Sequence, residues 1–554
     1  MRFRNKKWYV IPAVLVLFLG VVLGMQIESA VSGDDTFEQL KKLEDAFLVI
    51  DRKYVEEVDA KKLAESAIAG MLKALDPHST FIPAEEVAEI QESYQGSFGG
   101  IGIWFEPAAT EKDTAKVTST IPDGPSEMVG IMAGDRIVAI NDSSAIGMNS
   151  RAIQKRLKGP VGTKVKVTVL RPGARRTLDF VITRDRIPLY SIDSAYMVDD
   201  RTGYIRIGRF AMTTHREFVE HLRRLRAQGM QRLILDLRDN PGGIKQTAVQ
   251  VADELLKGGR TIVYTRGRNP DENEVDRSTD GGLFEEGPVI VLVNGNSASG
   301  SEIVAGALQD HDRALLVGRR TFGKALVQRP FPLSDGSVLQ VTVSRYYTPA
   351  GRLIQTPYEN GDMESYFEHK MEVRQMNLDE IPDSLKFQTD HGRIVIGGGG
   401  ILPDVIVRPD STLSFYAPLV LAVREQALDI RFIRAWFNQH ETALRATWGD
   451  RQQAFMDTFE VDEALWKAFW DYAAEEGDLH LVEAAAADPE AGRFAREEAE
   501  AHRHVLATLL KARLAQRLYR SEVAYPIFNQ IEPDFLEAMR QWDHAAELAA
   551  FHAR

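Results

Sequence analysis

Between residues 187 and 410, short apolar runs typical of strands alternate with amphipathic stretches typical of helices. This alternation indicates an α/β core whose strands are largely parallel. An acidic, unpatterned stretch at about 357–390 interrupts it and predicts a surface insertion. Strands are expected at residues 204–210, 233–237, 261–264, 289–293, 314–317 and 339–344, and helices at 215–226 and 247–256.

Three regions flank this core, so the predicted fold class is multidomain α+β. Residues 34–95 carry apolar residues at three- and four-residue spacing, which predicts helices that act as a spacer or a dimerisation element. Residues 96–186 contain short β-type runs between glycines and prolines, which predicts a small β domain. Residues 411–554 have a helical period, with breaks expected at Gly477, Pro489 and Pro526. We expect a helix-bundle core there, filled by Trp436, Trp466, Phe469, Trp470, Tyr519 and Trp542.

The first 33 residues have the pattern of a membrane anchor. Four basic side chains precede an uncharged run at residues 8–25, which as a helix spans about 27 Å, close to the thickness of a bilayer core. The basic flank should stay in the cytoplasm, so the bulk of a single-pass inner-membrane protein should lie in the periplasm or another extracytoplasmic space. A cleaved signal peptide is the alternative, and Glu28-Ser29-Ala30 fits its cleavage site poorly.

Composition excludes several classes of site. The 67 basic and 80 acidic residues give a net charge of −13, which makes nucleic acid an unlikely main partner. The chain has no cysteine, so disulfides, thiolate metal sites and a cysteine nucleophile are ruled out. Its 12 histidines show no metal-ligand spacing, and we expect neither a metal nor an organic cofactor.

The first chemical signal is a serine-rich turn. The apolar run at residues 289–293 leads into N-G-N-S-A-S-G-S-E and then into a helical pattern. A tight turn of this kind exposes a serine at a helix N-terminus, where the helix dipole favours a developing negative charge. Alternatively, Ser297, Ser299 and Ser301 only cap the helix.

The second signal is Lys324, in the segment T-F-G-K. Its apolar neighbours predict burial, which should lower the lysine pKa from about 10.4 toward neutrality. A neutral amine accepts a proton from a serine hydroxyl, and Gln328 would hold that amine in place. The alternative is an ordinary surface lysine.

The third signal is D-L-R-D-N-P-G-G at residues 236–243. Glycines at the end of a strand allow backbone N–H groups to point into a site, as an oxyanion hole requires. An ordinary strand-to-helix turn would have the same composition.

Together these segments resemble the carboxyl-terminal processing peptidases, a serine peptidase family with a Ser–Lys pair. L-D-P-H-S at 75–79, Y-Y-T-P-A-G-R at 346–352 and G-I-L-P-D at 400–404 add to the resemblance. It implies Ser299 as nucleophile, Lys324 as general base and Gln328 as its support. It also implies an oxyanion hole made by the N–H of Gly300 and one N–H from the Gly242-Gly243 turn. Gly300 and Ala325 depart from the usual alanine and glycine of the family.

The β-rich region is similar to a PDZ domain. Gly100, Ile101, Gly102 and Ile103 resemble its carboxylate-binding loop, and A-G-D-R-I at 133–137 resembles its strand–turn signature. Such a domain captures the free C-terminus of a peptide in backbone N–H groups and adds the peptide to a sheet edge.

The resulting hypothesis is an anchored, extracytoplasmic serine endopeptidase that binds protein C-termini through its PDZ domain and cleaves near them. Its expected partners are protein or peptide substrates and the membrane, with a possible homo-oligomer. The main alternative is a non-catalytic PDZ scaffold with an inactive peptidase core, and a weaker one is a hydrolase of small acyl substrates. A histidine triad would have to use His311, which lies about three helical turns from Ser299.

Overall fold

The computed structural model describes residues 34–552, except 109, 111, 122, 360–363, 365, 369–380 and 520. The predicted anchor at residues 8–25 and the middle of the predicted insertion lie outside these residues. Among the described helices, none combines the length and the apolar character needed to cross a bilayer.

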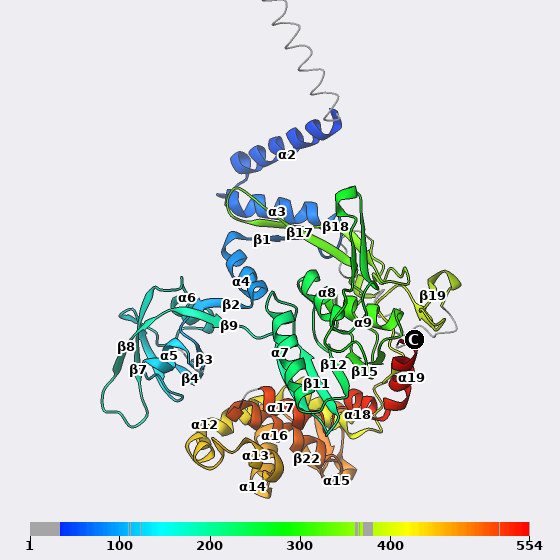
Figure 1. Ribbon diagram of the computed structural model, residues 1–554. Coiled ribbons are helices and arrows are strands. Elements are labelled where there is room, and N and C mark those ends of the chain that lie inside the picture. Colours follow the sequence, from blue (N-terminus) through cyan, green and yellow to red (C-terminus); the bar gives the residue numbers. More distant parts are fainter. Residues whose placement is uncertain are drawn as a thin grey trace, which may run out of the picture.

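A six-stranded, mostly parallel sheet forms the centre of the core (Figure 1). Its order is β10-β11-β12-β15-β16-β21, and only the β10–β11 pair is antiparallel. The central strand β15 is buried along its whole length, so its continuous run of β-branched and leucine residues is what a strand covered on both faces needs. The strands are β10 (Ile192–Met197), β11 (Thr202–Ile207), β12 (Arg232–Asp236), β15 (Val289–Val293), β16 (Leu315–Gly318) and β21 (Val405–Ile406).

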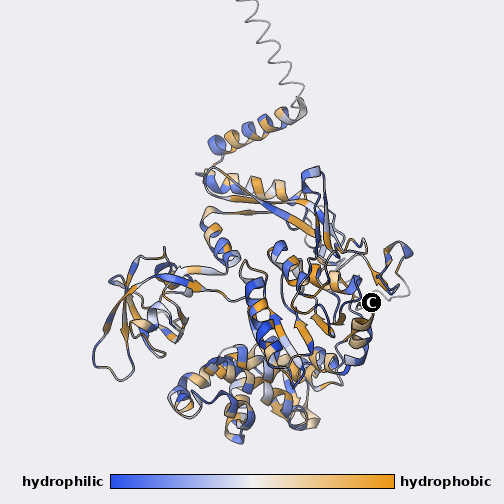
Figure 2. Cartoon of the chain, viewed as in Figure 1, coloured by the Kyte–Doolittle hydropathy of each residue, from blue (hydrophilic) through white to orange (hydrophobic). Residues whose placement is uncertain are grey.

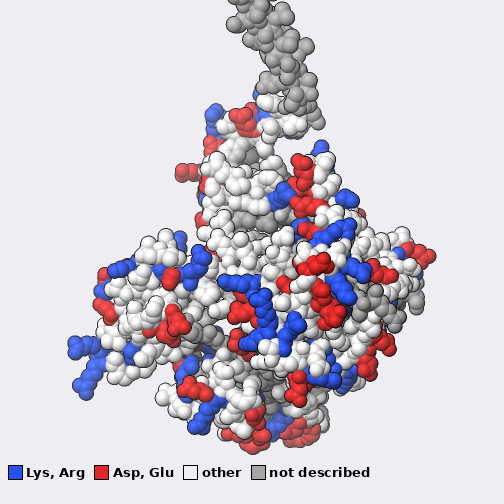
Figure 3. All heavy atoms as spheres, viewed as in Figure 1, with Lys and Arg blue, Asp and Glu red and all other residues white. Residues whose placement is uncertain are grey.

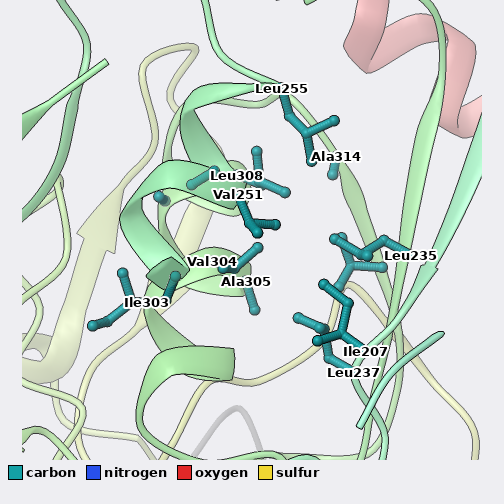
Figure 4. Close-up of a cluster of buried hydrophobic side chains, with 14 of the residues drawn as sticks. Ile207, Leu235, Leu237, Val251, Leu255, Ile303, Val304, Ala305, Leu308 and Ala314 are labelled. Atoms are coloured by element: carbon teal, nitrogen blue, oxygen red, sulfur yellow. The ribbon is translucent and has the colours of Figure 1, made fainter. Parts of the chain in front are cut away.

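One face of this sheet is covered by α7 (Thr214–Ala227), α8 (Lys245–Asp253) and α9 (Gly300–Asp310). Figure 4 shows Val304 and Leu308 of α9 packed among side chains from the sheet and from the α8 segment. Burial of each such side chain contributes about 1.5–3 kcal/mol. Figure 2 shows the central strands as hydrophobic and α7 as mixed, as expected for a helix with one face toward solvent.

The other face is covered from the C-terminal region. In α18 (Pro533–Arg540) and α19 (Trp542–His552), Phe535, Trp542 and Leu548 pack against Ile290 and Val317 of the sheet. The prediction that Trp542 fills a helix bundle is therefore wrong. A parallel sheet needs both faces covered, and these two helices supply the second cover.

A second, antiparallel sheet contains β1 (Thr80–Ile82), β13 (Thr261–Gly267), β14 (Val275–Arg277), β17 (Leu326–Pro332) and β18 (Val338–Tyr347). The sequence pattern had placed β13 and β18 in a largely parallel core, and this is wrong. A short hairpin joins β17 to β18 and makes that pair antiparallel. Strand β18 also pairs with β1, so the N-terminal region contributes to this sheet.

The small β domain has its own core and the sheet order β3-β4-β5-β7-β8. It includes the helices α5 (Pro125–Met128) and α6 (Ser150–Leu157), and a ribbon of β2 (Ser97–Gly100) and β9 (Asp185–Pro188) joins it to the rest. Among the described residues β3 pairs only with β4, so no described strand occupies its other edge. The strands are β3 (Ile103–Glu106), β4 (Ala115–Thr120), β5 (Arg136–Ile140), β6 (Ser143–Ser144), β7 (Lys164–Leu170) and β8 (Leu178–Thr183).

The N-terminal region forms α2 (Asp34–Lys53), α3 (Ala60–Lys73) and α4 (Ala84–Gln95). Several apolar side chains of α2 are exposed, including Phe37, Leu40 and Val49. Two short strands, β19 (Lys386–Gln388) and β20 (Ile394–Ile396), pair with each other around the end of the predicted insertion.

The C-terminal helices build a separate aromatic core around Trp466, Phe469 and Trp470. Pro526 lies inside α17, so the break predicted at this residue is wrong. The carbonyl of Glu522, which a proline four residues later cannot bond, accepts a hydrogen bond from Ser194 Oγ at 3.4 Å. The helices are α11 (Pro418–Glu425), α12 (Leu428–Trp448), α13 (Gln452–Thr458), α14 (Glu463–Gly477), α15 (Arg496–Ala501), α16 (Arg503–Tyr519) and α17 (Ser521–Phe528). The short strands β22 (His480–Val482) and β23 (Arg493–Ala495) pair among them.

The C-terminal helices also contact the small β domain (Figure 1). Lys116 Nζ lies 2.6 Å from Glu441 Oε2, and Arg445 donates to the carbonyl of Thr118 at 3.2 Å. Glu106 is paired with Arg517 and accepts a hydrogen bond from the Asn438 amide. On the visible face, acidic and basic side chains are interspersed (Figure 3).

Candidate active site

The three serines after β15 have different surroundings. The hydroxyl of Ser297 donates to the carbonyl of Leu237 at 2.8 Å, and that of Ser301 donates to the carbonyl of Asn240 at 3.0 Å. Both serines are fully buried and tie this turn to the one after β12. Ser299 is only partly buried. It is therefore the serine of the three that is available to a substrate.

The backbone presents Ser299 in an unusual conformation. Its φ of 53° lies in the left-handed region, which costs a non-glycine residue energy. Gly242 lies directly against it, since a Cβ added to Gly242 would stand 2.7 Å from Ser299 Cβ and 2.8 Å from the Gly300 nitrogen. Only glycine allows the two turns to approach this closely.

Glu302 connects the serine segment to the lysine segment. Its Oε2 accepts hydrogen bonds from the N–H groups of Ser299 and Lys324, each at 2.9 Å. Its Oε1 accepts from Thr321 Oγ1 at 2.5 Å and from the Gly323 N–H at 2.7 Å. Burial raises the pKa of Glu302 to about 7, although all four hydrogen bonds oppose that rise.

Lys324 follows Gly323 just before β17 and is partly buried. Burial lowers its pKa, while the nearby carboxylates of Glu302 and Asp76 raise it. Within the described part of the chain, its ammonium group forms no ion pair or hydrogen bond. An amine that is desolvated and lacks a direct counter-ion loses its proton readily.

Tyr346 provides a second link between the two segments. Its hydroxyl lies within hydrogen-bond distance of the carbonyl oxygens of Ser299, at 3.1 Å, and Lys324, at 2.7 Å. The hydroxyl is buried and has a raised pKa, so it stays protonated as a donor. Ser299 and Lys324 are thus held together through their backbones from two sides.

The predicted oxyanion donors differ in their availability. The N–H of Gly242 donates to Asn240 Oδ1 at 2.8 Å and is already used. The N–H groups of Gly243 and of Gly300, the first residue of α9, have no acceptor among the described residues. Gly243 and Gly300 are thus the available donors, and Gly242 serves the close approach of the two turns.

The side chain of Gln328 is bonded to Thr342 rather than to Lys324. Gln328 Nε2 donates to Thr342 Oγ1 at 3.3 Å, and no contact between its amide and Lys324 is found in the described chain. Its role as support for the amine stays a prediction.

Both ring nitrogens of His311 are occupied, by Asp390 Oδ2 at 2.8 Å and by the carbonyl of Thr261 at 2.7 Å. His311 therefore anchors the end of α9.

The L-D-P-H-S segment reaches the site from the N-terminal region. Asp76 accepts hydrogen bonds from the N–H of Ser79, at 2.8 Å, and from its hydroxyl, at 2.6 Å. Ser79 Oγ in turn accepts from the N–H of Thr342 at 3.1 Å, next to the Gln328 contact. The ring of His78 meets that of Phe322, two residues before Lys324, edge to face.

The predicted carboxylate-binding loop lines a groove in the small β domain. The groove has a volume of about 250 Å³ and is lined mainly by apolar side chains, including Phe98, Ile103, Leu157 and Ile187. The N–H groups of Ile101 and Gly102 donate to no other described residue. Two unused donors beside a free sheet edge suit the end of a peptide chain.

Sequence reasoning missed the linking residues Glu302, Asp76 and Tyr346. One signal for Glu302 was present, since S-x-x-E at the start of a helix is the capping-box pattern. The motifs that contain Asp76 and Tyr346 gave no sign that they would meet Lys324. Within the described residues, no group of three or more His, Asp or Glu side chains is arranged to hold a metal ion.

Comparison with known proteins agrees with this arrangement. Residues 201–364 match the profile of peptidase family S41, and residues 90–170 match that of the PDZ domain. The carboxy-terminal-processing protease of Bartonella bacilliformis is 38% identical over 354 residues, which cover 62% of this chain and 80% of that protein. The chain is a carboxy-terminal processing protease of peptidase family S41.

Three further similarities were found. The carboxy-terminal processing protease CtpA of Bacillus subtilis is 33% identical to this protease over 382 residues, covering 68% of the chain and 76% of CtpA. Among solved structures, the photosystem II D1 C-terminal processing protease is 28% identical, with a TM-score of 0.34 and coverage of 67% and 94%. Residues 23–86 of the protease match the profile of the activating protease CtpB N-terminal domain.

Proposed function

We propose that the protease cleaves peptide bonds with Ser299 as nucleophile and Lys324 as general base. The observation that carries this assignment is the shared carboxylate of Glu302, which fixes the backbones of both residues at once. Neutral Lys324 takes the proton of the Ser299 hydroxyl as the oxygen attacks the substrate carbonyl. The resulting ammonium group then gives that proton to the leaving amine, and water hydrolyses the acyl-enzyme.

The N–H groups of Gly243 and Gly300 are assigned to the tetrahedral intermediate. Both are unused within the described chain, and Gly300 begins α9, where the helix dipole favours negative charge. Loss of one such donor in other serine peptidases costs about 10²–10³ in kcat.

The PDZ domain supplies the preference for chain ends. A peptide that lies along the free edge of β3 with its carboxylate at Ile101 and Gly102 is bound only if its C-terminus is free. The apolar lining of the groove favours apolar C-terminal residues. Cleavage near the bound end then follows from tethering the substrate to the same molecule as the active site.

Substitutions at the two catalytic positions test this assignment. Ser299→Ala and Lys324→Ala should abolish cleavage of a fluorogenic peptide with a free apolar C-terminus. Lys324→Arg should fail as well, because a guanidinium stays protonated and accepts no proton. Exposed Ser143→Ala and Lys467→Arg serve as controls and should keep full activity.

Two outcomes would contradict the proposed catalytic assignment. Substantial activity of Lys324→Arg would remove the lysine from its role as base. If the protein bound such peptides but cleaved none at any pH, it would be a PDZ scaffold with an inactive core.

We propose further that residues 8–25 anchor the protease in the inner membrane, with the peptidase on the extracytoplasmic side. The support is the basic flank before an uncharged run of bilayer length. A reporter active only in the periplasm, fused after Gly33, should give signal from the membrane fraction. Signal from the soluble fraction alone would mean that the segment is cleaved.

A further inference from the structure

We propose that Tyr366 is a positioning residue whose ring completes an aromatic cover over the segment of Lys324 and keeps water away from its amine. This inference rests on the proposed role of Lys324 as general base. Tyr366 belongs to the predicted insertion at about 357–390, so the inference gives that insertion a part in the reaction.

The ring of Tyr366 does not lie on the surface, where an insertion is expected to place it. Its side chain is completely buried, whereas the nearby Glu364, Phe367 and Glu368 are exposed. A buried tyrosine removes about 150–250 Å² of surface from water. One aromatic ring of the insertion therefore covers part of the molecule beneath it.

The ring of Tyr366 meets two other rings beside Lys324. Its centre lies 5.3 Å from that of His78 and 6.2 Å from that of Phe322. The rings of His78 and Phe322 are themselves 6.4 Å apart, so the three form one cluster. Phe322 precedes Lys324 by two residues, and His78 follows Asp76, whose charge acts on Lys324, by two residues. The cluster thus lies at the lysine.

The chain that leads into the insertion is bonded on both sides of the lysine. The N–H of Thr356 donates to the carbonyl of Gly323 at 2.9 Å. The N–H of Ala325 donates to Gln355 Oε1 at 2.8 Å. The hydroxyl of Tyr366 faces the side chains of Gln355 and Thr356. Both ends of the Tyr366 side chain are therefore held against the same short segment.

The cover acts on the amine by excluding water. Water stabilises an ammonium group, so its exclusion favours the neutral amine that a general base needs. Burial raises the pKa of Tyr366 and of Tyr346, so both hydroxyls stay neutral and bring no charge to Lys324. The titratable groups around Lys324 are Glu302 of α9, Asp76 and His78 of the N-terminal region, Tyr346 of β18 and Tyr366 of the insertion.

The test is the pH profile of kcat/KM for a fluorogenic peptide, measured on the full chain. In the parent, kcat/KM should rise with pH through the pKa of Lys324 and then reach a plateau. Tyr366→Ser admits water and raises that pKa, so the rise should move to higher pH by about one unit. Below the rise this variant should be about tenfold slower than the parent, and at the plateau it should be within about twofold.

Conservative variants and controls separate the cover from general damage. Tyr366→Phe keeps the ring and should leave the profile in place. Phe367→Ser removes the neighbouring ring, which is 49% exposed, and should also leave it in place. The shift caused by Tyr366→Ser should persist in a His78→Phe background, because His78 is not the titrating group. If Tyr366→Ser does not fold, Tyr366→Val keeps part of the cover and should shift the rise by about half a unit.

The outcomes separate this inference from the function on which it rests. A parent profile without a rise would overturn Lys324 as general base, and the role of Tyr366 with it. If the parent profile rises and Tyr366→Ser lowers the rate equally at every pH, or leaves the profile unchanged, the role of Tyr366 is overturned while Lys324 stands. A rate above that of the parent at every pH would overturn it too, since the ring would then block the substrate.

Discussion

Glu302 holds the segment of Ser299 and the segment of Lys324 on one buried carboxylate. A buried carboxylate is costly unless its oxygens are hydrogen-bonded, and here four donors meet it. The backbones of Ser299 and Lys324 are thus both held by this carboxylate, and neither the Ser299 hydroxyl nor the Lys324 amine is used for that link.

The charge of Asp76 provides a test of the lysine base. Because Asp76 raises the pKa of Lys324, the neutral Asp76→Asn should let the amine lose its proton at lower pH. The rise of kcat/KM with pH should then move to lower pH, with a plateau within about twofold of the parent because Asn keeps the turn that Asp76 forms. The measurement is a pH profile of peptide cleavage.

Exposed Asp200→Asn is the control for this profile and should leave it in place. A shift of the Asp76→Asn profile to higher pH, or none at all, would argue that the titrating group is not Lys324.

At the scale of single residues, the sequence motifs named the candidate residues but not their contacts. The proposal of Ser299 rather than Ser297 or Ser301 came from the family resemblance, and the buried hydrogen bonds of the other two hydroxyls support it. The N–H of Gly242 donates to the Asn240 side chain, whereas the N–H of Gly243 has no acceptor among the described residues. The spacing of residues in the motif does not predict this difference.

At the scale of elements, the packing of α19 against the central sheet should contribute to the stability of the core. Trp542 is 8% exposed, lies in the cluster on the second face of the central sheet, and stacks under the Arg232 guanidinium. Trp542→Ala should lower the free energy of unfolding of the core by about 3 kcal/mol, since a large side chain leaves a cavity. Hydrogen exchange in β12 and β15 should become faster.

Leu536→Ala, at an exposed position of the neighbouring helix α18, is the control and should cost less than about 1 kcal/mol. If Trp542→Ala left exchange in β15 unchanged, α19 would not be part of the core.

The extent of several core strands could be predicted from apolar runs, as β12 and β15 show. Which strands pair with one another could not be predicted from these runs. The direction of β18 follows from its hairpin with β17 and its pairing with β1, which comes from the N-terminal region. The helical period of α18 and α19 predicts an apolar face but does not say which surface that face covers.

At the scale of the whole molecule, the C-terminal helices join the PDZ domain to the peptidase core. They contact β3 and β4 of the PDZ domain through Glu441, Arg445 and Arg517. Glu532, at the start of α18, is paired with Arg238 of the turn that ends in Gly242 and Gly243. One region thus touches both the PDZ domain and the turn to which the proposed mechanism assigns an oxyanion donor.

Charge exchange across this contact should reveal how firmly the PDZ domain is held. Lys116→Glu should loosen it, because the carboxylate would face Glu441. The radius of gyration from small-angle scattering should rise, and Lys116→Glu combined with Glu441→Lys should restore it. Exposed Lys61→Glu is the control and should change nothing. No increase for Lys116→Glu would mean that other contacts hold the domain.

The cover of the central sheet by α18 and α19 also sets an order of events during synthesis. A ribosome adds about 5–20 residues per second, and domains generally fold from the N-terminal side as they emerge. The last face of the sheet waits until residues 294–532 have been made, so β15 stays half uncovered while they emerge. While these residues are made, the uncovered apolar face of β15 is accessible to chaperones.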